Sequence, residues 1–281
     1  MFKHIAVGLD GSPHAAAAEE IALAFASHFG AVVHGVHVID ATFLEGAFIT
    51  DISGAMGFEP FVNLQPQVLS TLEDLAATVR ERFDERCRAA GAQGVFHLER
   101  AAVVQGMLAS ARMADLLVVG QRGVSSRLHE DSLGRVAGAL LRRSPVPVLV
   151  CPENPVLPKR PLLAYDGSPK AIRALHVAAE LCRSLALPLL VMTVDEDATR
   201  ARVRLDEAAG YLDPFRIEAE LRREPGEAVE QVLLGQLEPG DLDLLCLGAH
   251  GHRRVVELVL GSTTEYLARR SPVPLLCITR A

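Results

Sequence analysis

Two motifs each occur twice in the chain, and this repetition constrains the fold more than any other feature of the sequence. The tetrapeptide DGSP at 10–13 recurs at 166–169, and the hexapeptide RRSPVP at 142–147 recurs at 269–274. Motifs repeated in the same order along both halves indicate a duplicated structural unit. The offsets are 156 and 127 residues, so the first copy carries a net 29 extra residues between its landmarks.

The length of the chain agrees with two ordinary domains. With 281 residues, each half is large enough to bury a core of its own. We assign residues 1–152 to the first domain, with an insertion at about 41–65, and residues 160–281 to the second. The linker at 152–161 contains four prolines.

Short apolar runs alternate with helical patterns in both copies, which predicts an α/β fold with a parallel sheet covered on both faces. The predicted strands are Ile5–Leu9, Val32–Ile39, Val95–Leu98, Asp115–Val119 and Val146–Cys151, then Pro161–Tyr165, Leu187–Val194, Arg216–Leu221, Leu242–Leu247 and Val273–Ile278. The clearest helices are predicted at 12–30, Val68–Ala90, Gln105–Met113, Leu133–Arg143 and 262–270.

The stretch LLCLGAHG at 244–251 combines a buried strand with two glycines three residues apart. Such glycines allow a sharp backbone turn beyond the strand end. Gly261 and Ser262 then open a helix whose free N–H groups, dipole and hydroxyls can face an anion held by that turn. The pattern predicts a phosphate site, although the same glycines can form a plain turn and Ser262 a plain helix cap.

The full spacing, G-x2-G-x9-G-S-T, together with the two DGSP turns, resembles the ATP-binding signature of the universal stress protein family. The resemblance covers nearly the whole chain, twice, apart from the insertion. It implies two flavodoxin-like (Rossmann-like) domains, each a five-stranded parallel sheet of order 3-2-1-4-5 with helices on both faces. In such sheets, ligands bind past the carboxyl ends of the first and fourth strands.

The resemblance implies an ATP site in the second copy. The residues that match the signature or its surroundings are Asp166, Gly167, Val194, Leu247, Gly248, Gly251, His252, Arg253, Gly261, Ser262 and Thr263. Mg²⁺ would enter with ATP near Asp166, because no protein ligand set for a metal is recognisable. Each residue also has a structural alternative: an Asx turn for Asp166, strand core for Val194, and a solvated loop for His252 and Arg253.

The first copy carries a weaker form of the same signature at Asp10, Val38, Gly120, Gly123, Gly134 and Arg135. Its second spacer has ten residues, and Arg135 stands where the second copy has Ser262. Losing a hydroxyl contact to phosphate predicts weaker or altered binding there. Arg135 would offset the loss if its guanidinium reaches the phosphates, but it can equally point to solvent.

Charge and missing motifs limit the function classes. The net charge is −7 and neither half has a basic excess, which argues against nucleic acid and anionic membranes as partners. Five cysteines without a CxxC pair predict a reduced, cytoplasmic protein. No phosphate loop with lysine and no nucleophile elbow is present. We therefore expect a non-enzymatic, ATP-binding regulatory protein; a weak ATPase or phosphotransferase, and a scaffold with vestigial sites, are the alternatives.

Each copy ends in an apolar strand that the expected strand order leaves at the sheet edge. Exposed apolar edges favour pairing, so we expect the two copies to pair antiparallel there as an internal pseudo-dimer, with or without further homodimerisation. The insertion at 41–65 contains four of the ten phenylalanines. This apolar content predicts that it packs near the first pocket or the domain junction, the alternative being a disordered excursion.

Overall fold

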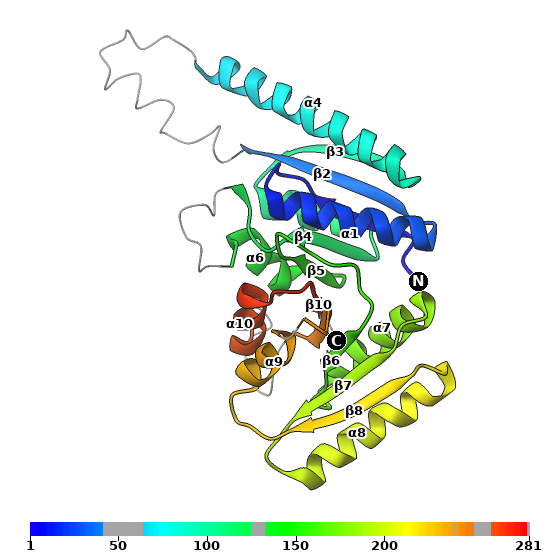
Figure 1. Ribbon diagram of the computed structural model, residues 1–281. Coiled ribbons are helices and arrows are strands. Elements are labelled where there is room, and N and C mark those ends of the chain that lie inside the picture. Colours follow the sequence, from blue (N-terminus) through cyan, green and yellow to red (C-terminus); the bar gives the residue numbers. More distant parts are fainter. Residues whose placement is uncertain (42–63, 125–132, 239, 250–259, 280–281) are drawn as a thin grey trace, which may run out of the picture.

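The structure, a computed structural model, describes residues 1–41, 64–124, 133–238, 240–249 and 260–279. Its two halves repeat one order of strands and helices (Figure 1). The N-terminal half contains β1 (His4–Gly8), α1 (Pro13–Phe29), β2 (Val32–Asp40), α4 (Leu64–Ala90), β3 (Gln93–Ala101), α5 (Val103–Ala111), β4 (Leu116–Gly120), α6 (Arg135–Arg143) and β5 (Val148–Cys151). The C-terminal half contains β6 (Pro161–Ala164), α7 (Pro169–Leu185), β7 (Leu189–Val194), α8 (Ala198–Leu212), β8 (Ala219–Glu224), α9 (Val229–Leu237), β9 (Leu244–Gly248), α10 (Ser262–Arg270) and β10 (Leu275–Ile278).

All of these strands belong to one sheet. Within the described residues its order is β3-β2-β1-β4-β5-β10-β9-β6-β7-β8. Pairing is parallel inside each half, and β5 pairs antiparallel with β10 at the centre, where Leu276 lies opposite Leu149. The predicted strand order 3-2-1-4-5 and the predicted pairing of the two edge strands are both confirmed.

The composition of β5 and β10 explains this pairing. Their sequences are VLVC and LLCI, and every residue of both strands is buried. Polar contacts on the same seam reinforce the pairing: the Thr279 hydroxyl donates to the Ser144 carbonyl at 2.9 Å, and Gln121 Nε2 donates to the Ala268 carbonyl at 2.8 Å. An apolar edge that would invite aggregation is therefore covered by its own duplicate.

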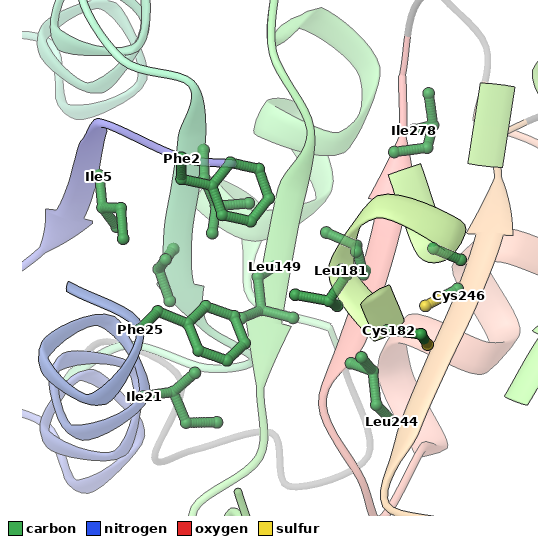
Figure 2. Close-up of a cluster of buried hydrophobic side chains, with 14 of the residues drawn as sticks. Phe2, Ile5, Ile21, Phe25, Leu149, Leu181, Cys182, Leu244, Cys246 and Ile278 are labelled. Carbon is green, nitrogen blue, oxygen red and sulfur yellow. The ribbon is translucent and has the colours of Figure 1, made fainter. Parts of the chain in front are cut away.

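The core runs without interruption across the junction. Figure 2 shows Phe25, Ile21 and Leu149 of the N-terminal half beside Leu181 and Leu244 of the C-terminal half. Helices α1, α4, α7 and α8 cover this face of the sheet, and α5, α6, α9 and α10 cover the other with a second apolar cluster. The five cysteines are free and buried, as predicted for reduced thiols.

The repeated DGSP motif forms the same helix start in both halves. The Ser12 hydroxyl accepts the Ala15 N–H at 3.1 Å, and the Ser168 hydroxyl accepts the Ala171 N–H at 3.2 Å. Proline follows each serine at the first helical position, where its missing N–H costs nothing. Helices α1 and α7 are thus capped by residues of the repeated motif itself.

Three sequence predictions need correction or fall outside the description. The strand predicted at 216–221 lies at Ala219–Glu224, because a 3-10 turn at Asp213–Phe215 ends with Arg216 in a left-handed conformation, φ 55°. Strand β3 is longer than predicted. The insertion at 41–65, except for its terminal residues, lies outside the described residues, so its proposed packing stays a prediction.

The central strand pair gives the first testable prediction. Leu276 is 2% exposed, so Leu276→Ala should lower the free energy of unfolding by about 2–5 kcal/mol, the usual cost of a Leu-to-Ala cavity. Leu221, 39% exposed on edge strand β8, is the matched control, and Leu221→Ala should cost less than about 1 kcal/mol. Denaturant unfolding of the two variants compares them, and equal losses would contradict the central role of the β5–β10 pair.

Candidate functional site

A cavity lies at the carboxyl ends of the strands in each half, at the reversal of strand order between the first and fourth strands. The C-terminal cavity measures about 850 Å³ and the N-terminal one about 660 Å³. Both volumes suit a small organic ligand. Because β5 and β10 run antiparallel, the strands of the two halves point their carboxyl ends in opposite directions.

The C-terminal cavity brings together part of the predicted site. Of the predicted residues, those that line it are Asp166, Val194, Leu247, Gly248 and Thr263. Gly167, Gly261 and Ser262 lie beside it without lining it, and Ser262 is exposed at the start of α10. Gly251, His252 and Arg253 fall outside the described residues, so their predicted contacts stay predictions.

The N-terminal cavity brings together all of its predicted residues. It is lined by Asp10, Val38, Gly120, Gly123, Gly134 and Arg135. Arg122, which the sequence analysis did not single out, joins them from the turn after β4. The arginine at the helix start therefore borders the cavity.

Asp10 and Asp166 both form Asx turns, the structural role that the sequence allowed as an alternative to ligand binding. Asp10 Oδ1 accepts the Ser12 N–H at 2.9 Å, and Asp166 Oδ1 accepts the Ser168 N–H at 2.9 Å. Each is an Asx turn, and the glycine between has φ near +75°, a conformation that favours glycine. These turns fix each carboxylate at the mouth of its cavity before any ligand binds.

The glycine that ends each fourth strand is required by packing. A Cβ on Gly248 would lie 2.5 Å from the Lys170 carbonyl carbon, and one on Gly120 would lie 2.8 Å from the His14 carbonyl carbon. Both contacts are with the backbone of a helix, which cannot shift without a cost in free energy. The strand end and the helix start can therefore approach closely only at glycine, whether or not a ligand binds.

The turn after Gly120 is tied to Asp10. The second carboxylate oxygen of Asp10 accepts the Val124 N–H at 3.1 Å, and a Cβ on Gly123 would lie 2.6 Å from the same oxygen. The Gly134 N–H donates to the Gln121 carbonyl at 3.0 Å, which fastens the start of α6 to this turn. Strand end, turn and helix start thus form one connected wall of the N-terminal cavity.

An ion-pair cluster forms part of the C-terminal cavity wall. Asp195, 7% exposed directly after β7, accepts hydrogen bonds from Arg200 Nε at 2.6 Å and Arg204 Nη1 at 2.8 Å. The hydrogen bond from Arg200, followed by the Asp197 N–H, holds the pKa of Asp195 well below its usual range. This cluster was not predicted from the sequence, in which its one signal is an aspartate just beyond a buried strand.

Helix α10 begins beside the same cavity without a side-chain cap. Its N-cap, Gly261, has no side chain that could accept a hydrogen bond, so the first N–H groups of the helix have no side-chain cap among the described residues. The Thr263 hydroxyl donates to Glu230 Oε2 at 3.2 Å. Uncapped N–H groups at a helix start favour an anion at this place.

The family was settled by comparing the whole chain with known proteins. The sequence pattern of the Universal stress protein family matches residues 1–152 and again residues 158–279. The chain belongs to the universal stress protein family. A universal stress protein of Synechocystis sp. is 29% identical over 290 residues, covering 98% of this chain and 99% of that protein.

Solved structures support the fold. A universal stress protein from Archaeoglobus fulgidus superposes with a TM-score of 0.77 at 23% identity, covering 99% of this chain and 96% of that one. A structure from Pseudomonas aeruginosa gives a TM-score of 0.62 at 16% identity, covering 99% and 93%. The two-copy arrangement is thus found across the full length of other chains.

Two further observations concern metals and membranes. In the part of the chain that the structure describes, no group of three or more His, Cys, Asp or Glu side chains is placed to hold a metal ion. No helix among the same residues is long and apolar enough to cross a membrane.

The packing role of Gly248 gives a second prediction. Gly248→Ala should destabilise the ligand-free protein by about 1–3 kcal/mol, because the new methyl group overlaps the backbone of α7. Gly235→Ala in α9 is the control: a Cβ there meets nothing within 4 Å, so helix propensity should raise stability by up to about 1 kcal/mol. Denaturant unfolding without nucleotide measures both, and a neutral Gly248→Ala would contradict the packing argument.

The cluster around Asp195 gives a pH-dependent prediction. Its folded-state pKa lies below the unfolded value, so its ion pairs stabilise the fold above about pH 4 and are lost as pH falls through the folded value. Asp195→Asn should lower the free energy of unfolding at pH 7, and the difference from wild type should shrink below about pH 4. Asp206→Asn, at an exposed carboxylate, is the control. A difference that stays constant down to pH 3 would be inconsistent with the cluster.

Proposed function

We propose that this universal stress protein is a nucleotide-dependent regulatory protein that binds ATP with Mg²⁺ in its C-terminal cavity. The observation that carries the proposal is the convergence of Asp166, Val194, Gly248 and Thr263 on one cavity of about 850 Å³. Uncapped N–H groups at the start of α10 border the same space. The polar groups at the mouth of this cavity suit the phosphates of a nucleotide, and its apolar floor suits the base.

The floor of the cavity suits the base. Met192 and Val194 from β7, with Val229 and Leu233 from α9, give it an apolar surface. The phosphates would then extend toward Gly248 and the start of α10. Asp166, fixed by its Asx turn, would share Mg²⁺ with the phosphate oxygens, since this ion commonly takes one or two carboxylates plus phosphates.

We infer that the protein acts by binding, with occupancy altering its conformation or its choice of partner. Among the described residues of the cavity, the carboxylate with the clearest pKa shift is Asp195, and that shift is downward. A general base needs a pKa near the working pH, so Asp195 is a poor candidate to activate water. Phosphate release slower than about 1 s⁻¹, the low end of ordinary enzymes, is the corresponding expectation.

A pair of matched substitutions tests the site. Thr263→Glu places a carboxylate at the second residue of α10, facing the cavity, whereas Thr199→Glu places one at the second residue of α8, outside the cavity lining. In Thr263→Glu the new carboxylate should repel the phosphates and weaken ATP binding in the presence of Mg²⁺ at least tenfold, about 1.4 kcal/mol, whereas Thr199→Glu should leave the affinity unchanged. Calorimetry measures the affinities. Equal affinities in both variants would place ATP elsewhere.

A further inference from the structure

Three histidines form a hydrogen-bonded row across three neighbouring strands of the N-terminal half. His4 Nδ1 lies 3.1 Å from His34 Nε2, and His34 Nδ1 lies 3.0 Å from His97 Nε2. The centroids of neighbouring rings are 5.4 Å and 5.2 Å apart. The side chains come from β1, β2 and β3, so the row joins the middle strand of this half to the edge strand of the sheet.

The row lies on the face of the sheet that α5 covers. His4 and His34 alternate onto the same face as Ala6 and Val36, which belong to the apolar cluster under α5. The sequence of α5, VVQGMLASA, contains no titratable side chain. The element packed over this part of the sheet therefore brings no charge of its own to the row.

The charged groups on the strands lie beside the row or face away from it. Glu99 shares the face of His97 on β3, with its Cβ beside α5 at the position of Gly106. Asp40 shares the face of His34 at the far end of β2. The Lys3 ammonium donates to the Phe29 carbonyl at 3.3 Å, on the other side of the sheet.

Two charged residues follow α5 in the chain and come close to the start of β1. Asp115 accepts the His4 backbone N–H at 2.9 Å, and Arg112, exposed, is the C-cap of α5. Burial, followed by repulsion from the His97 and His4 imidazoles, lowers the pKa of His34. The protonation of the central ring therefore depends on its two neighbours in the row.

The number of protons that the row can hold follows from its geometry. Each of the two contacts between rings takes one proton, and each end of the row has one free ring nitrogen. Three neutral histidines carry three protons, which occupy both contacts and one end. One more proton fits at the other end with both hydrogen bonds kept. A further proton has no place unless a contact breaks, whichever tautomers the rings start from.

We propose that this row is an acid-responsive switch, which takes up one proton with its hydrogen bonds intact and breaks on the second, loosening edge strand β3. Two imidazolium ions at the ring separation of 5.2 Å repel each other, and β3 pairs with β2 alone. The corresponding strands of the other half, β6, β7 and β8, contain no histidine. Acid should therefore loosen the N-terminal edge of the sheet before the C-terminal edge.

The direction of the effect follows from the central ring. The folded-state pKa of His34 lies below its ordinary value of 6.5, so the unfolded chain binds the proton more readily than the folded chain. The contribution of the row to stability is therefore complete above about pH 6.5 and is lost as pH falls through the folded value.

NMR of the ring nitrogens in the full chain, titrated from about pH 8 to about pH 5, tests the coupling of the three rings. In the wild type the row should take up its first proton at least about one pH unit above its second, with all three rings responding. His34→Gln should separate the outer rings, so that His4 and His97 each titrate in a single step. His176→Gln, at an exposed histidine of α7, is the control and should leave the coupled titration unchanged.

Hydrogen exchange, corrected for its intrinsic pH dependence, tests the effect on the edge strands. Between about pH 7 and about pH 5, protection of the β3 amides should fall at least about tenfold, while that of β8 should change less than about threefold. His97→Gln, which removes the member of the row on the edge strand, should make β3 protection independent of pH in this range. This variant keeps the test available if His34→Gln does not fold.

Three results would overturn the proposal. They are independent single-step titration of the three rings in the wild type, equal loss of protection in β3 and β8, and a β3 response that His97→Gln leaves unchanged. Neither measurement uses a nucleotide, so the outcome does not depend on the proposed function of the C-terminal cavity.

Discussion

The pairing of β5 with β10 is the interaction on which the rest of the structure depends. Each strand is four apolar residues long and buried on both faces, so neither half has a stable edge without the other. Their antiparallel contact joins two five-stranded sheets into one and lets a single apolar cluster run from α1 to α7 (Figure 2). It also points the two sets of strand ends in opposite directions, which keeps the two cavities apart.

Duplication within this frame allowed the cavities to diverge. The backbone features that shape them are the same in both halves: an Asx turn after the first strand, a glycine pressed against a helix start, and an uncapped helix beyond. The side chains placed on that backbone differ. Among the described residues, four carboxylates and two arginines bound to Asp195 border the C-terminal cavity, whereas two carboxylates and two arginines border the N-terminal one.

The fold could be predicted from the sequence because the repeated motifs, the apolar strands and the helix-capping residues can each be recognised in short stretches of the chain. The position of β8 was predicted wrongly for two reasons. Its sequence, AELRRE, is charged and shows little alternation of apolar and polar residues, and no sequence pattern indicates the left-handed conformation of Arg216 that precedes it. Gly248 was assigned to phosphate binding, whereas contact with α7, 78 residues earlier, already demands glycine. The arginine contacts of Asp195, and the burial of Arg122 Nε with no hydrogen-bond partner among the described residues, depend on three-dimensional packing that no short sequence pattern indicates.

The central claim is that the C-terminal cavity is a nucleotide site built from Asp166, Val194, Gly248 and the start of α10. A crystal structure of the full chain grown with saturating ATP and Mg²⁺ tests it most directly. The account predicts a base against Met192 and Val194, with phosphates between Gly248 and the first turn of α10. A C-terminal cavity that holds no nucleotide under those conditions would contradict it.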